Sequence, residues 1–142
     1  MEEKCTNQAY LELMQTSKAI QDCIKMEMMN HKINITEFSV LEVLYFKEKQ
    51  TIQQIGKSIL ISSGSMTYVI DKLEQKGFIK RIDCPNDRRV IHVVLTENGM
   101  NLMEKIMPKH RDLINNMLGD LTDQESQTMI KLLKKVSKRV ET

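Results

Sequence analysis

Apolar residues recur every three or four positions along most of the chain, a period that predicts amphipathic helices. Four such segments come first: residues 7–29, a helix that Thr36 can cap, residues 52–59 and Ser63–Lys76. Thr51 and Gln54 form a capping box in front of the third segment, and Gly77 is placed to end the fourth. Because only residues 60–62 separate the third and fourth helices, the pattern predicts a helix-turn-helix.

The period then changes to two residues, which is typical of strands. Phe78–Ile82 and Val90–Leu95 are rich in β-branched residues, and the turn-forming segment Asp83–Asp87 lies between them. Two short strands joined in this way predict a β-hairpin, or wing, directly after the helix-turn-helix. The expected fold class is therefore mainly α with one small hairpin, a winged helix-turn-helix.

Two long amphipathic helices follow the predicted wing. One begins near Thr96, is expected to kink at Pro108 and ends at Gly119, while Thr122 and Glu125 form a capping box for the other. The expected element order is α-α-α-α-β-β-α-α. The expected domains are an N-terminal helical segment (1–35), a winged domain (36–96) and a C-terminal helical segment (97–142).

The terminal helices carry more apolar surface than the small central unit needs, because that unit already has a core of its own. A second copy of the same helices would bury this surface. The pattern therefore predicts a two-fold homodimer with N- and C-terminal dimerisation helices. A monomer whose ends fold back on its centre is the alternative.

Length and composition are those of one compact unit, or of one protomer of an oligomer, and they predict a cytoplasmic protein. No apolar run reaches the roughly 18 residues of a membrane span, and the start of the chain is acidic, unlike a signal peptide. Cys5, Cys23 and Cys84 lack Cys-x-x-Cys spacing and the histidines are scattered, so no disulfide, metal or cofactor is predicted. Nine Lys and Arg against five Asp and Glu in residues 47–92 make the middle of the chain the candidate polyanion-facing part.

The fourth predicted helix presents short hydroxyl groups opposite its apolar stripe. Such groups near a helix N-terminus can approach phosphates, where free backbone N–H groups also favour an anion. Tyr68 and Lys72 extend further and could reach base edges in a major groove. A simple capping segment would explain the serines equally well. The candidate DNA contacts on this helix are Ser63, Ser65, Thr67, Tyr68 and Lys72.

Two adjacent arginines, Arg88 and Arg89, lie where the second strand begins, next to a tight turn. This position could deliver them into a minor groove or onto phosphate. Asp87 could orient one of them through a charge-assisted hydrogen bond. Alone, such a pair fits a solvated surface equally well, but beside a helix-turn-helix it favours duplex DNA as the partner.

Two stretches of the chain resemble the MarR family of bacterial transcriptional regulators. One is residues 61–77, and the other is residues 87–99, an Asp-x-Arg wing that runs into Leu-Thr-x-x-Gly. The resemblance implies a dimeric repressor whose recognition helices enter successive major grooves of a near-palindromic operator, with wing arginines in the flanking minor grooves. Tyr68 departs from the pattern, since many relatives carry Arg there, and this leaves the base preference at that contact open.

The resemblance also implies release from DNA by a small phenolic, quinone-like or other lipophilic effector, or by oxidation of a thiol. A pocket between the dimer helices and the DNA-binding lobe would serve the first route, with ordinary core packing as the alternative role for its residues. Candidate lining residues are Met26, Met29, Phe38, Tyr45 and Phe46. Cys5 is the candidate redox thiol, because the neighbouring Lys4 favours a thiolate.

Two further functional classes compete with this interpretation. An enzyme is not supported, because the sequence has no nucleophile elbow, phosphate-binding loop or metal-spaced histidine pair. A winged-helix module that docks proteins and has no DNA role is the other alternative, because the fold alone does not guarantee DNA binding. Such a module has no need of Thr67, Lys72, Arg88 and Arg89 together. We therefore interpret the chain as a homodimeric, sequence-specific DNA-binding regulator.

Overall fold

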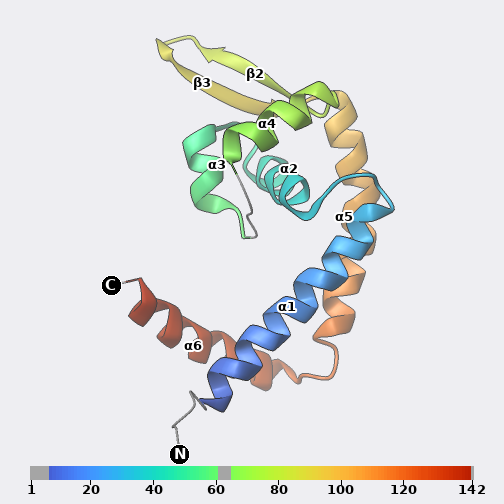
Figure 1. Cartoon of the computed structure of the whole chain (residues 1–142), viewed down its shortest axis with the longest axis vertical. Helices are drawn as coiled ribbons and strands as arrows, with labels where there is room; N and C mark the ends of the chain where they lie inside the picture. Colours follow the sequence, from blue (N-terminus) through green and yellow to red (C-terminus); the bar gives the residue numbers. More distant parts are fainter. Residues whose placement is uncertain (1–6, 61–64, 142) are drawn as a thin grey trace, which may run out of the picture. The chain divides into compact units, whose positions relative to one another are not determined.

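The computed structural model describes residues 7–60 and 65–141, and it forms two units that meet in sequence between Ile106 and Met107. The elements in chain order are α1 (Gln8–Met29), α2 (Ile35–Lys47), β1 (Gln50–Thr51), α3 (Ile52–Ser58), α4 (Met66–Gln75), β2 (Ile79–Cys84), β3 (Asp87–Leu95), α5 (Glu97–Met117) and α6 (Asp123–Val140) (Figure 1). This order confirms the expected helical fold with a hairpin wing and adds the short strand β1.

Capping boxes begin α3 and α6 as expected, at Thr51 and Thr122. The prediction for α2 is wrong by two positions, because Asn34 and not Thr36 caps this helix. The Asn34 side chain accepts a hydrogen bond from the Glu37 amide at 2.8 Å, and the Glu37 carboxylate accepts one from the Asn34 amide at 2.9 Å. Thr36 is buried within the first turn.

The helix-turn-helix consists of α3 and α4, with a longer connection than the three residues expected. The α3 helix ends at Ser58 because Ile59 is extended, and α4 begins at Met66 because the extended Ser65 is its N-cap. The predicted start of the fourth helix at Ser63 is therefore wrong, since Ser65 already lies before the first helical residue. Residues 61–64 are outside the described residues.

The C-terminal end of α4 is a Schellman motif, a hydrogen-bonded helix end built around a left-handed residue. Gly77 has a φ of 83°, a conformation that favours glycine. The Phe78 amide donates to the Leu73 carbonyl at 3.1 Å, and the Gly77 amide donates to the Glu74 carbonyl at 3.0 Å. The chain thereby turns directly from α4 into the wing.

The sheet has three antiparallel strands in the order β1-β3-β2. In the wing, β2 pairs with β3 from Ile79 opposite Leu95 to Cys84 opposite Asp87. Only residues 85–86 turn the chain, fewer than the predicted loop Asp83–Asp87. At the base, β1 pairs Gln50 with Val93, which joins the wing to the segment that starts α3.

Thr96 connects the end of α4, the wing and α5 at one point. Its hydroxyl donates to the Gly77 carbonyl and accepts from the Gly99 amide, and its amide donates to the Phe78 carbonyl at 3.0 Å. A Cβ on Gly99 would collide with the Phe78 carbonyl oxygen. The Leu-Thr-x-x-Gly stretch is therefore a tightly packed backbone junction.

The core of the first unit is aliphatic and contains methionine, as expected of a chain with no Trp and three Phe. Its most deeply buried side chains include Met28, Leu41, Leu44, Ile55, Ile70, Leu73, Ile79, Val93 and Met103. One charged group is enclosed beside it: the Glu37 side chain is only 4% exposed and lies 2.8 Å from Lys76 Nζ. This ion pair joins the end of α4 to the start of α2.

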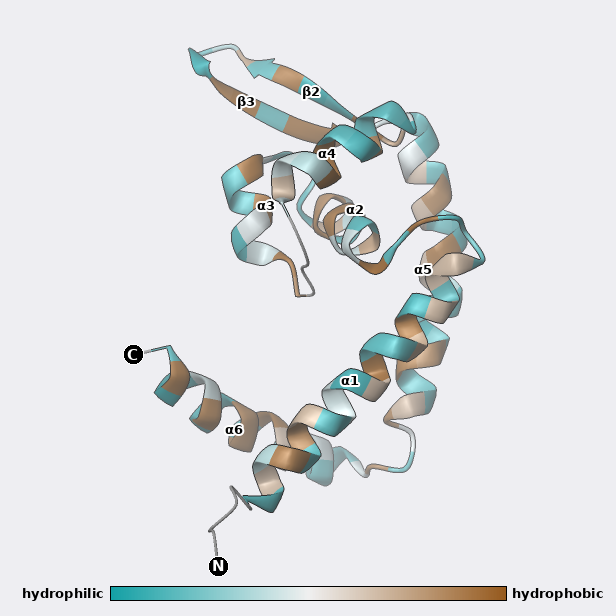
Figure 2. Cartoon of the chain, in the orientation of Figure 1, coloured by the Kyte–Doolittle hydropathy of each residue, from teal (hydrophilic) through white to brown (hydrophobic). Residues whose placement is uncertain are grey.

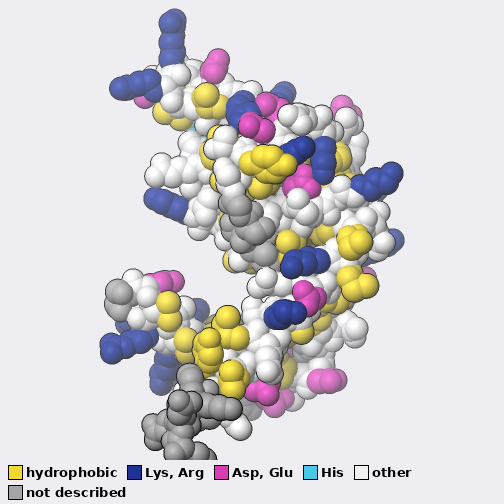
Figure 3. All heavy atoms as spheres, in the orientation of Figure 1, with side chains coloured by type: hydrophobic (Ala, Val, Ile, Leu, Met, Phe, Trp, Pro, Cys, Tyr) yellow, Lys and Arg dark blue, Asp and Glu magenta, His cyan; other side chains and the backbone are white. Residues whose placement is uncertain are grey.

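The second unit leaves an apolar surface open along α6, which has no buried residue among its described positions Asp123–Val140. Figure 2 shows brown, hydrophobic positions alternating with teal ones along this helix, and Figure 3 shows hydrophobic side chains at the surface over it. The exposed apolar side chains are Ile130, Leu132, Leu133, Val136 and Val140. None of the described helices is long and apolar enough to span a membrane.

Candidate nucleic-acid interface

The outer face of α4 displays the side chains that the sequence nominated for DNA contact. Val69, Ile70 and Leu73 are buried, which leaves Thr67, Tyr68 and Lys72 exposed on the other side. Lys72 Nζ lies 5.6 Å from the centre of the Tyr68 ring, a cation–π contact that holds the two side chains together. Ser65 caps the same helix, and Ser63 lies outside the described residues.

An ion-pair cluster that the sequence analysis did not identify lies beside this face. Arg81 of β2 binds two carboxylates of α4, with its Nη2 2.7 Å from Asp71 Oδ1 and its Nη1 on Glu74 Oε1. The hydrogen bond to Asp71, together with the negative charge of Glu74, raises the pKa of Arg81 above its ordinary value. The sequence feature that could have revealed this cluster is the spacing of three residues between the two acids, because it puts both on one side of α4.

The wing presents both predicted arginines to solvent. Arg88 is exposed, and the Arg89 side chain is 91% exposed. Asp87 accepts hydrogen bonds from the Arg89 amide at 3.0 Å and from Arg89 Nε at 3.3 Å, so the orienting bond predicted for one of the pair goes to Arg89. Figure 3 shows Lys and Arg side chains protruding at the tip of the wing.

An exposed helix face with Tyr and Lys, followed by a wing with exposed arginines, is an arrangement that fits a groove and its flanking phosphates. Comparison with known proteins decides the family. The MarR family model matches residues 33–91. The HTH-type transcriptional regulator MhqR of Bacillus subtilis is 42% identical over 127 residues, which cover 89% of this chain and 88% of MhqR.

The chain belongs to the MarR family. Solved structures agree on the fold: the family member AbsC from Streptomyces coelicolor superposes with a TM-score of 0.86 at 19% identity, covering 99% of this chain and 98% of AbsC. A mutant MarR from Escherichia coli, solved in complex with operator DNA, gives a TM-score of 0.81 at 25% identity and covers 94% of this chain and 99% of its own. This MarR-family chain is therefore a DNA-binding transcriptional regulator and not an enzyme.

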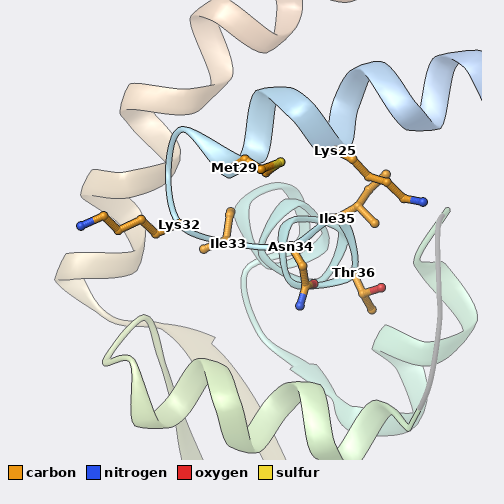
Figure 4. Close-up of a pocket in the computed structure, with 7 residues that line it drawn as sticks. All are labelled: Lys25, Met29, Lys32, Ile33, Asn34, Ile35 and Thr36. Atoms are coloured by element: carbon orange, nitrogen blue, oxygen red, sulfur yellow. The ribbon is translucent and has the colours of Figure 1, made fainter.

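A pocket of about 590 Å³ lies where α1 ends and α2 begins (Figure 4). Its lining residues are Lys25, Met29, Lys32, Ile33, Asn34, Ile35 and Thr36. Of the five residues nominated for an effector pocket, Met29 lines it, Phe38 is buried in the core, and Met26 and Phe46 are exposed. Tyr45 packs edge-on against Phe46 with ring centres 5.3 Å apart.

The structure describes two of the three cysteines in this MarR-family chain. Cys23 and Cys84 are half-buried free thiols, on α1 and at the wing turn. Cys5, the candidate redox thiol, lies outside the described residues. Within residues 7–60 and 65–141, no three His, Cys, Asp or Glu side chains are grouped so as to hold a metal ion.

Proposed function

We propose that this MarR-family protein is a homodimeric, cytoplasmic repressor that binds a near-palindromic operator and is released by a small lipophilic effector. The observation that carries the proposal is the exposed face of α4 together with the arginine-tipped wing that follows it. Both belong to the same unit, and the junction at Thr96 fixes one to the other.

We assign the reading of base edges to α4. We assign contact with phosphates or with the minor groove to the wing. Thr67, Tyr68 and Lys72 present a hydroxyl, a phenol and an ammonium group that can reach base edges and phosphates in a major groove. Arg88 and Arg89 are long, exposed and always charged, which suits a minor groove or the backbone. The E. coli relative was solved in complex with operator DNA, which supports duplex DNA as the partner of this chain.

Dimerisation is assigned to the terminal helices. The apolar stripe of α6 is exposed, and so are Tyr10, Leu11, Leu13 and Met14 on α1. Exposed apolar surface of this kind, taken on each helix separately, is typical of an interface. A two-fold axis would present two α4 helices about one helical turn of DNA apart, roughly 34 Å, which matches two half-sites.

The effector site is assigned to the pocket at the α1–α2 junction. Met29, Ile33 and Ile35 give it an apolar lining, while Lys25 and Thr36 offer an ammonium group and a hydroxyl beside it. Such a lining with a few polar groups suits a small aromatic ring that carries a hydroxyl. This pocket favours an effector of phenolic type over the alternative of thiol oxidation at Cys5.

The decisive experiment is a fluorescence-anisotropy titration of the protein against its own upstream DNA, with excess random duplex as competitor. We expect tight binding that resists the competitor and weakens steeply with salt. In the double variant Arg88→Ala/Arg89→Ala we expect the slope of log affinity against log salt to fall by about 1.8, because two phosphate contacts are lost.

The matched control is Lys105→Ala/Lys109→Ala, which removes the same charge from exposed positions of α5. Its salt slope should stay that of the wild type. If both double variants showed the same loss of salt slope, the wing would have no specific part in the DNA interface. Binding that random duplex abolishes would instead support a protein-docking module.

A further inference from the structure

Arg81 occupies an unusual place among the cationic groups near α4, because it points at the helix and not at solvent. Its side chain is 27% exposed, and its guanidinium bridges Asp71 and Glu74, whose side chains are 51% and 41% exposed. One cation on β2 therefore engages two acids on α4.

The two acids lie where negative charge is costly to a DNA-binding protein. Asp71 is three residues after Tyr68 and next to Lys72, and Glu74 lies one further turn along the helix. Carboxylates close to phosphates repel them within about 10 Å at moderate salt. Without a cation in place, this part of α4 would weaken the contact that Tyr68 and Lys72 make.

The cluster is not needed to fix the wing onto the rest of the unit. The base of the wing is already held by pairing of β1 with β3 and by the hydrogen bonds from Phe78 to Leu73 and from Thr96 to Phe78. Exposed ion pairs add little to such a backbone framework. The backbone framework therefore leaves an electrostatic role open for the Arg81 side chain.

We propose that Arg81 is a positioning residue for DNA binding, which holds and neutralises the carboxylates of Asp71 and Glu74 so that phosphates meet Tyr68 and Lys72. This inference rests on the proposed function in one respect, because it requires the outer face of α4 to meet DNA. It assigns a measurable share of the DNA affinity to a residue whose observed side-chain contacts are with two acids of the protein itself.

The test compares Arg81→Ala with Lys80→Ala, its neighbour on β2, which is exposed and loses the same charge. Affinity is measured by anisotropy on a duplex that the wild-type protein selects from a random pool. At about 50 mM salt we expect Arg81→Ala to bind about tenfold more weakly than Lys80→Ala, and at about 300 mM the ratio should shrink to about threefold or less. Thermal melts of both variants check that folding is unaffected.

Removing the two acids should restore the DNA affinity that Arg81→Ala loses. In the background Asp71→Asn/Glu74→Gln, which should bind at least as tightly as wild type, Arg81→Ala should cost no more than Lys80→Ala. Equal affinities of Arg81→Ala and Lys80→Ala in the wild-type background, or a tenfold loss that persists without the acids, would overturn the inference. Lys72→Ala separates the two proposals, because full affinity in that variant would remove α4 from the DNA interface itself.

Discussion

At the scale of single residues, Gly99 shows how a short sequence pattern can encode a close backbone contact. The resemblance pointed to Leu-Thr-x-x-Gly, but only the structure gives its reason. Thr96 bridges the Gly77 carbonyl and the Gly99 amide, and the Gly99 Cα approaches the Phe78 carbonyl too closely for any side chain. The glycine is required for space and not for an unusual φ.

Gly99→Ala is therefore expected to lower the free energy of unfolding by about 1–3 kcal/mol, because the added methyl group must displace the wing base. Gly56→Ala is the matched control, since a Cβ at this position of α3 meets no atom within 4 Å. The control should stabilise the protein by about 0.5–1 kcal/mol through helix propensity. Urea denaturation measures both, and a Gly99→Ala protein as stable as wild type would contradict the assigned clash.

Other residue-level features lay beyond sequence reasoning because several residues could play one role. Asn34 and Thr36 are both good helix caps, and the choice depends on the path of the chain after α1, where Lys32 takes a positive φ of 59°. The Arg81 cluster depends on how β2 folds back against α4. Such contacts follow from tertiary geometry, which periodicity does not contain.

At the scale of elements, periodicity located the helices and the wing well, because each buries one face and the other remains polar. It missed β1, since two residues are too few to show a period of two. It also placed the start of α4 too early, because the serines before Ser65 fit a helix face and a cap equally well. The contacts predicted on α4 and the wing share one unit, although their role in DNA binding stays a prediction.

The junction of α1 and α2 carries the prediction for the effector. Met29→Trp should fill the pocket and abolish release of DNA by a small phenol such as catechol, while DNA affinity itself stays unchanged. Met26→Trp is a matched control, because Met26 and Met29 are both 72% exposed on α1 and only Met29 lines the pocket. Anisotropy with increasing catechol measures the release, and equal sensitivity of the two variants would place the effector elsewhere.

At the scale of the whole molecule, the exposed stripe of α6 predicts the state of assembly. Val136→Glu puts a charge into this stripe and should convert a dimer into a monomer, because a buried unpaired charge is costly. Sedimentation velocity measures the mass. Gln127→Glu introduces the same side chain on the opposite side of α6, since nine residues span two and a half turns. This control should remain dimeric, and a dimeric Val136→Glu protein would exclude α6 from the interface.

The open apolar surface of α6 has a consequence for gene dosage. If only a pair of chains covers that surface and contacts both half-sites, the amount of active regulator rises with the square of the chain concentration when protein is scarce. Occupancy of the operator would then respond steeply to how much protein the cell makes. A modest fall in synthesis of the regulator would then relieve repression more than proportionally. The cellular concentration of the regulator would control the target gene alongside any effector.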